Sequence, residues 1–127
     1  MFDLSADEAR LLLNVALMAV GRNRFNSAAR ILAALERFRP DSPQLAVSKA
    51  IALLSALKYA ECLDFIEGDA LRRFPGNPML RAFKGMALIR LGRAEDSREV
   101  LAKVCEEGAA DAAAVQLAGD LLKEVKA

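Results

Sequence analysis

All four prolines of the chain fall in two copies of one short signal, Pro40-Asp41-Ser42-Pro43 and Pro75-Gly76-Asn77-Pro78. The second copy lies 35 residues after the first, and each follows an Arg-Phe pair at the end of a helical-looking stretch. Proline ends a helix because it lacks an N–H, and it starts one well because its φ is already helical. In both copies a capping residue, Ser or Asn, precedes the second proline. A helix-stop and helix-start signal that recurs at this spacing predicts a stacked array of helical hairpins.

The composition favours helices packed on helices within a single domain, residues 1–127. Of the 127 residues, 54% are hydrophobic and only 6% are aromatic, with alanine and leucine dominant. Such a chain is long enough to bury a core, and its residue types suit close helix packing better than a sheet. The net charge of +1 provides no field to hold nucleic acid or an anionic membrane. We therefore expect an all-α domain that binds neither.

The sequence indicates a cytoplasmic protein. The first four residues, Met-Phe-Asp-Leu, lack the basic region and uncharged apolar run of a signal peptide. The most apolar run, Leu11 to Val20, is interrupted by Asn14 and is too short to span a bilayer. Cys62 and Cys105 have no metal-ligand spacing and fall on predicted inner helical faces, which indicates reduced core thiols.

Arginine clusters around the first hairpin, at Arg22, Arg24, Arg30, Arg37 and Arg39. A solvated face of that hairpin accounts for such a cluster, and a site for an acidic partner is the alternative.

Seven helices are predicted, over about 5–20, 25–38, 43–56, 59–74, 78–92, 94–107 and 111–125. Ser5 and Glu8 form a capping box at the start of the first helix, and Gly108 ends the sixth. The connections are short, so consecutive helices must run antiparallel. The helices make three hairpins, over about 5–40, 43–75 and 78–108, followed by a terminal helix over about 111–125.

These hairpins resemble the tetratricopeptide repeat, a helix–turn–helix unit of about 34 residues. The first helix of that repeat carries a small residue where its two helices touch, a place held here by Ala16, Ala50 and Gly85. Its second helix carries an aromatic residue, then a small one, then a bulky one. The matching sets are Phe25-Ala28-Leu32, Tyr59-Cys62-Ile66 and, more weakly, Ala94-Ser97-Leu101. The resemblance implies an α-solenoid of three degenerate tetratricopeptide-like hairpins plus a C-terminal capping helix.

The chain departs from the repeat pattern in three ways. The large aromatic residue expected early in each first helix is replaced by Leu12, Ala46 and Arg81. The second hairpin holds one extra residue, seen as an interruption at 67–69, and only the third copy has the turn glycine, Gly92.

The sequence lacks the patterns that most often carry catalysis or metal binding. There is no histidine, which removes the commonest general base and the commonest transition-metal ligand. The acidic pairs Asp7-Glu8 and Glu106-Glu107 are adjacent on helix ends, where consecutive side chains point apart. No phosphate-binding glycine loop is present either. We expect no enzyme, no cofactor and no metal.

The resemblance implies that the first helices of the hairpins line a concave groove, and the side chains in those places are aliphatic or methionine. They are Leu13, Leu17, Val20, Val47, Ile51, Leu54, Met79, Met86 and Ile89. Such side chains cannot clamp a peptide carboxylate, but they suit the apolar face of an amphipathic helix. Left in water they predict a partner, or self-association when the partner is absent. The alternative is that the same residues form core under the C-terminal helix.

A small protein of three degenerate hairpins with an apolar groove also resembles the type III secretion chaperones that hold a needle subunit before export. The residues behind this likeness are the first hairpin, 11–40, the Arg-Phe-Arg-Pro40 junction, and the segment 82–92. The resemblance implies a small helical protein as partner, namely a secretion substrate such as a needle subunit, with a co-chaperone as a further candidate. The alternatives are a general scaffold or assembly factor, for example in pilus or envelope biogenesis, or a regulatory module of a larger protein.

Overall fold

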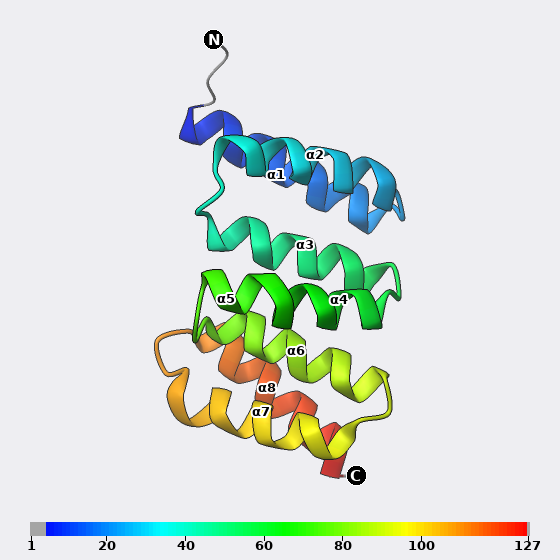
Figure 1. Ribbon diagram of the computed structural model, residues 1–127, viewed down its shortest axis with the longest axis vertical. Coiled ribbons are helices and arrows are strands. Elements are labelled where there is room, and N and C mark those ends of the chain that lie inside the picture. The colour runs from blue at the N-terminus through cyan, green and yellow to red at the C-terminus, as the bar shows by residue number, and fades with distance from the viewer. Residues whose placement is uncertain (1–4, 127) are drawn as a thin grey trace. The chain divides into compact units, whose positions relative to one another are not determined.

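The computed structural model describes residues 5–126, and every regular element in that range is helical. The elements are α1 (Ala6–Gly21), α2 (Phe25–Phe38), α3 (Pro43–Ser55), α4 (Tyr59–Phe65), η1 (Ile66–Ala70), α5 (Leu71–Arg73), α6 (Pro78–Arg90), α7 (Ala94–Glu107) and α8 (Ala112–Lys126) (Figure 1). Because α4, η1 and α5 follow one another without a break, these residues form seven helical rods, as the sequence predicts.

Side-chain caps set several of the helix starts. The Glu8 N–H donates to Ser5 Oγ at 3.1 Å and the Ser5 N–H donates to Glu8 Oε1 at 3.3 Å, so the predicted capping box is present. Asn77 Oδ1 accepts the Leu80 N–H at 3.0 Å at the start of α6. By contrast, Ser42 makes no side-chain cap, so α3 begins with the help of its proline alone.

The extra residue of the second hairpin is taken up inside a helix. The predicted interruption at 67–69 is a π-helical turn, η1, set between α4 and α5. A π turn widens the helix by one residue per turn and keeps the backbone hydrogen-bonded. The helical run therefore continues from Tyr59 to Arg73 despite the insertion.

The turns after the first helix of each hairpin share one backbone conformation. Asn23, Leu57 and Gly92 have φ values of 61°, 62° and 80°, in the left-handed region. Backbone bonds repeat as well, because the N–H of Arg24 donates to Ala19 O and that of Arg93 to Leu88 O, each at 2.8 Å. Only the third copy uses glycine, the residue that adopts this conformation without a steric cost.

The chain divides into two compact units, residues 1–57 (unit 1) and 58–127 (unit 2). The single domain expected from the sequence stays a prediction, and the units are described separately. In unit 1, α1 packs on α2, and α3 packs on both. Its core consists of Ala16, Val20, Ala28, Leu32, Leu35, Leu45 and Ala52.

In unit 2, α6 lies against α4, η1, α7 and α8, and α8 also packs on α7. One core cluster of this unit consists of Ala82, Leu101, Val104, Ala114, Ala118 and Leu121. Gly85 is buried where α6 meets α7, and a Cβ added there would collide with the Leu101 side chain. The expected role of a small residue at a helix crossing is therefore visible at Gly85.

Candidate partner-binding surfaces

In unit 1 the predicted groove residues lie on the two helices expected, α1 and α3. Val20 is a core residue, only 7% exposed, so it offers little surface to a partner. The others remain half-buried: Leu13, Leu17, Val47, Ile51 and Leu54. Among them, Leu13 and Ile51 pack against the unit 1 core. The structure thus leaves five aliphatic side chains of unit 1 partly accessible.

The three α3 residues of this set follow one stripe. Val47, Ile51 and Leu54 are spaced four and three residues apart, which places them along one face of the helix. Leu13 and Leu17 are one turn apart on α1, which contacts α3. We name these five residues the inner face of unit 1. Its side chains carry no formal charge and no hydrogen-bond donor, so it can bind only through apolar contact.

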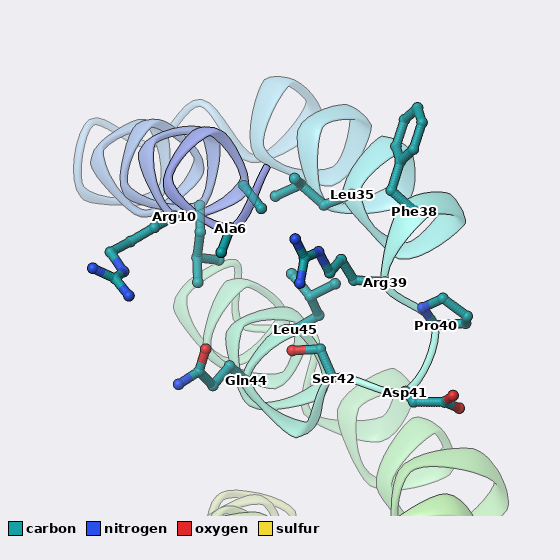
Figure 2. Close-up of a pocket in the computed structure, with 12 residues that line it drawn as sticks. Ala6, Arg10, Leu35, Phe38, Arg39, Pro40, Asp41, Ser42, Gln44 and Leu45 are labelled. Atoms are coloured by element: carbon teal, nitrogen blue, oxygen red, sulfur yellow. The ribbon is translucent and has the colours of Figure 1, made fainter. Parts of the chain in front are cut away.

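A pocket of about 470 Å³ lies in unit 1, lined by α1, the end of α2, the connecting loop and the start of α3. Its apolar lining includes Leu13, Leu35 and Leu45. Figure 2 shows the Arg39 side chain turned into the space between Leu35 and Leu45, whereas Asp41 points away from it. The sequence interpretation missed this pocket because it treated the first Pro-x-x-Pro only as a helix boundary. The uncapped start of α3 lies there as well.

In unit 2 the predicted groove residues have a neighbour of their own chain. Met79, Met86 and Ile89 of α6 are half-buried and pack against the cluster that includes Ala114 and Leu121 of α8. The terminal helix therefore covers part of this face of α6. The structure gathers these three residues around one core, and Leu13 and Ile51 around another.

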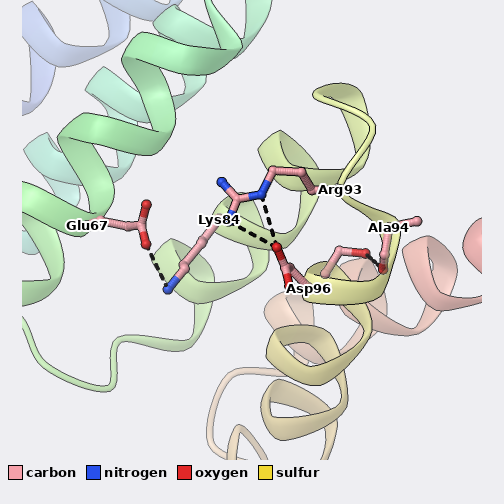
Figure 3. Close-up of polar contacts among 6 residues, drawn as sticks. Glu67, Lys84, Arg93, Ala94 and Asp96 are labelled. Atoms are coloured by element: carbon pink, nitrogen blue, oxygen red, sulfur yellow. Dashed lines mark hydrogen bonds and ion pairs between the residues drawn. The ribbon is translucent and has the colours of Figure 1, made fainter.

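Ion pairs connect α6 to three neighbouring elements of unit 2. Lys84 Nζ lies 3.4 Å from Glu67 Oε2 on η1 (Figure 3). Arg81 Nη1 lies 3.1 Å from Glu107 Oε2 on α7, and Arg90 Nη1 lies 2.9 Å from Glu124 Oε1 on α8. The hydrogen bond to Glu124 raises the pKa of Arg90. Each pair has at least one well-exposed partner, so each contributes little to stability, and the Arg90–Glu124 pair alone favours this placement of α8.

The outward side of α8 is polar. Gln116 Nε2 donates to Asp120 Oδ1 at 3.2 Å, and both residues are exposed. A polar outer side is what a helix needs where it faces water rather than another repeat.

The two cysteines form no disulfide and lie in different surroundings. Cys62 is 0% exposed, and burial raises its pKa to about 11. Cys105 is half-buried and packs against the unit 2 core cluster. A thiol with a raised pKa is a poor nucleophile because it holds little thiolate at neutral pH. Within residues 5–126 no group of three or more His, Cys, Asp or Glu side chains could hold a metal ion.

The five clustered arginines, Arg22, Arg24, Arg30, Arg37 and Arg39, are all exposed, as a solvated face requires. Over the described part of the chain, no helix has both the length and the apolar character needed to cross a membrane.

One apolar surface escaped the sequence interpretation. Leu11, Val15 and Met18 lie along α1 and are among the most exposed large hydrophobic residues. The run from Leu11 to Val20 is apolar at nearly every position, so periodicity could not show which side of the helix faces the core.

No family model matches the chain, and no curated protein matches its sequence. Solved structures do match its fold. The chain is similar to the structure described as the first TPR of Spaghetti (RPAP3) bound to the HSP90 peptide SRMEEVD, with a TM-score of 0.74 and 15% identity, over 99% of this chain and 96% of that one. It is also similar to a chain in a crystal structure of a T3SS complex from Aeromonas hydrophila, with a TM-score of 0.75 and 17% identity, over 96% of this chain and 83% of that one.

These likenesses establish the fold class. The chain has an all-α, tetratricopeptide-like fold, as the repeat pattern predicts. At such low identities the likeness concerns fold alone, and function must be argued from the surfaces described above.

Proposed function

We propose that the chain is a non-catalytic protein-binding module that holds an amphipathic helix of a type III secretion substrate, such as a needle subunit, before export. The observation that carries the proposal is the inner face of unit 1, where five aliphatic side chains remain half-buried without a charged residue among them. A fold shared with a chain of a T3SS complex supports the same function. Covering one apolar side of a subunit that polymerises through its helices would keep it from assembling in the cytoplasm.

Unit 2 supplies a model for how such a helix would bind. The side of α8 that meets α6 and α7 carries Ala114, Ala118 and Leu121, spaced four and three residues apart. Small and aliphatic residues at this spacing therefore fit the α6 face that holds Met79, Met86 and Ile89, which is the counterpart in unit 2 of the inner face. A partner helix with the same pattern would suit Leu13 and Leu17 in unit 1.

The accessible area favours reversible binding. Complete burial of a large aliphatic side chain contributes about 2 kcal/mol, so a half-buried one has roughly 1 kcal/mol left to gain. The five residues of the inner face together then contribute about 5 kcal/mol before ordering costs. Ordering of the partner helix offsets much of this gain, so the inner face contributes only modestly to the net affinity, as release at an export apparatus requires.

A second candidate function is a general scaffold or assembly factor, for example in pilus or envelope biogenesis, that binds a peptide in the unit 1 pocket. The observation that favours it is the pocket's lining, where Arg39 lies between the apolar Leu35 and Leu45 and Arg10 lies at the edge (Figure 2). The Arg39 guanidinium beside this apolar floor suits a peptide end that is both acidic and apolar.

Co-purification from the native host, followed by titration calorimetry with the helical protein that is recovered, tests the first function. Leu17→Asp and Leu54→Asp should each weaken binding at least about tenfold, because each places a charge in an apolar contact. Leu91→Asp is the matched control, since Leu91 is also an accessible leucine but lies in unit 2. Helical circular dichroism must be unchanged in all three.

The same titration separates the two functions. Binding that survives Leu17→Asp and Leu54→Asp contradicts the inner-face proposal. If Arg10→Glu or Arg39→Glu abolishes that binding instead, the scaffold function with its pocket is the better description.

A further inference from the structure

The outer side of α1 carries an apolar stripe that nothing in residues 5–126 covers. Leu11, Val15 and Met18 are 64%, 43% and 59% exposed. With about 100° of rotation per residue, the three lie within about 60° of one another on the helix. They lie opposite Val20, which faces the core. We name these three residues the outer stripe.

Opposite charges stand at the two ends of the outer stripe. Asp7 lies four residues before Leu11, and Arg22 lies four residues after Met18. Both side chains are exposed, and neither makes an ion pair with another residue of the described range. Asp7 lies in the first turn of α1 on the side of the stripe, and Arg22 is the C-cap residue directly after α1, where helical spacing continues that side.

Asp7 and Leu11 are four residues apart, as are Met18 and Arg22, so the two ends of this set match when α1 is read backwards with the charges inverted. Val15 lies next to the midpoint of the set. If two copies of α1 lie antiparallel, Asp7 of each faces Arg22 of the other, and Leu11 of each faces Met18 of the other. The two Val15 side chains meet near the centre. In a parallel pair, Asp7 would face Asp7 and Arg22 would face Arg22, which is unfavourable.

We propose that the outer stripe is a homodimer contact, in which α1 packs antiparallel against α1 of a second copy about a two-fold axis. A self-complementary patch of this kind is what a two-fold interface requires. The outer stripe lies on the side of α1 away from Leu13 and Leu17, so the dimer leaves the inner face of unit 1 available. The contact is therefore independent of the proposed partner helix.

One helix face buries much less than the roughly 800 Å² per partner that is typical of a stable complex. The dimer is accordingly weak and depends on concentration, and the ion pairs fix its direction more than its affinity. Because the ion pairs are exposed, added salt should weaken the dimer.

Sedimentation velocity of the full chain, from micromolar to millimolar concentration, tests the proposal. The wild-type chain should shift from monomer toward dimer. Met18→Glu should abolish the shift, because it buries two like charges at the contact. Asp7→Arg alone or Arg22→Asp alone should raise the dissociation constant about tenfold, since each turns two attractive pairs into repulsive ones.

The antiparallel direction is tested by combining the two charge changes. Asp7→Arg with Arg22→Asp in one chain should restore the dimer, and mixing the two single variants should produce a heterodimer. Asp64→Arg and Arg30→Asp are the controls, because they change the net charge equally at exposed positions that do not belong to α1. Circular dichroism checks that each variant is folded.

Three results would overturn the proposal. The first is a wild-type chain that stays monomeric at every concentration. The second is a dimer that Met18→Glu leaves intact. The third is a double charge variant as weak as the single ones, because it excludes the antiparallel pairing.

Discussion

Both units have an aliphatic helix face, but within residues 5–126 a further helix partly covers this face in unit 2 and not in unit 1. In unit 2, the α6 face with Met79, Met86 and Ile89 is partly covered by α8. In unit 1, the corresponding face of α1 and α3 has no such helix of its own among the described residues of that unit. The difference indicates that a terminal helix occupies the place that a partner helix is proposed to take. It also explains why an aliphatic stripe in the sequence does not by itself identify a binding surface.

The units differ as well in their exposed apolar residues. Among the described residues, unit 1 has five exposed large hydrophobic residues, namely Leu11, Val15, Met18, Phe38 and Leu57. Unit 2 has one, Leu91. In unit 2, the Arg90–Glu124 ion pair accompanies the apolar packing of α8 on α6. Unit 1 is therefore the more suitable side of the molecule for recruiting partners.

The largest expected effect comes from making unit 2 resemble unit 1. Ending the chain after Gly108 removes α8 and exposes Met79 and Met86. Loss of the buried Ala114, Ala118 and Leu121 side chains should lower the free energy of unfolding by about 4 kcal/mol, measured by urea denaturation. Binding of a hydrophobic dye should rise, and a synthetic peptide of residues 109–126 should reverse it.

The exposed Gln116 of α8 provides the control for this truncation, because Gln116→Ala should change neither measurement. A truncated chain with the stability and dye binding of the full chain would show that α8 does not cover α6.

The helix crossings of the two units differ by one methyl group. Ala16 is fully buried in unit 1, whereas Gly85 in unit 2 leaves no room for a Cβ beside Leu101. Gly85→Ala should therefore lower the free energy of unfolding by about 2 kcal/mol, although alanine is the better helix former. Ala16→Gly should lower it by a similar amount, through lost burial and helix propensity.

Gly68→Ala is the matched control for the glycine change, since a Cβ at Gly68 meets nothing within 4 Å. Its free energy of unfolding should stay the same or rise. Thermal and urea denaturation of the three variants measure these changes, and a Gly85→Ala chain as stable as wild type would mean that α6 and α7 can separate freely.

The smallest expected effect concerns the turns. Leu57, at the end of unit 1, has a φ of 62° that costs a leucine about 1 kcal/mol, whereas Gly92 in unit 2 holds a φ of 80° without that cost. Leu57→Gly should therefore raise the free energy of unfolding by about 1 kcal/mol, because the exposed Leu57 side chain buries little. Asn23→Gly should give only a few tenths of this gain, since asparagine tolerates the conformation.

Gly92→Leu is the opposite test and should be destabilising by about 1 kcal/mol. The melting temperatures of the Leu57→Gly, Asn23→Gly and Gly92→Leu chains measure these changes in stability. A decrease in the Leu57→Gly chain would mean that the leucine side chain contributes more than its backbone strain costs.

Much of the fold could be predicted from the sequence because proline and glycine act locally. Pro43 and Pro78 begin α3 and α6, as expected, and every predicted helix end lies within two residues of the observed one. The interruption expected at 67–69 is also real, although its form, a π turn, depends on backbone bonding that residue types do not specify.

The surfaces were harder to predict because they depend on what packs against each helix. Leu17 and Met86 each directly follow the small residue of their repeat, Ala16 and Gly85. Of the two, only Met86 packs against the core cluster that includes α8 residues. Val20 belongs to the core, and Met18, two residues away, is exposed, although both belong to one continuous apolar run. The hydrophobic pattern identifies a helix face, but the neighbouring helix determines whether that face is buried.

The π turn η1 also changes how the repeats must be aligned. Ala16 and Ala50 are 34 residues apart, whereas Ala50 and Gly85 are 35 apart, and the extra residue lies within Ile66–Ala70. A sequence comparison that assumes a constant repeat length is therefore one residue out of register after Ile66. It aligns each residue of the third repeat, Gly85 included, with the residue next to its true counterpart in the earlier repeats. Relatives of this chain are therefore best sought with a period that is allowed to lengthen at that helix.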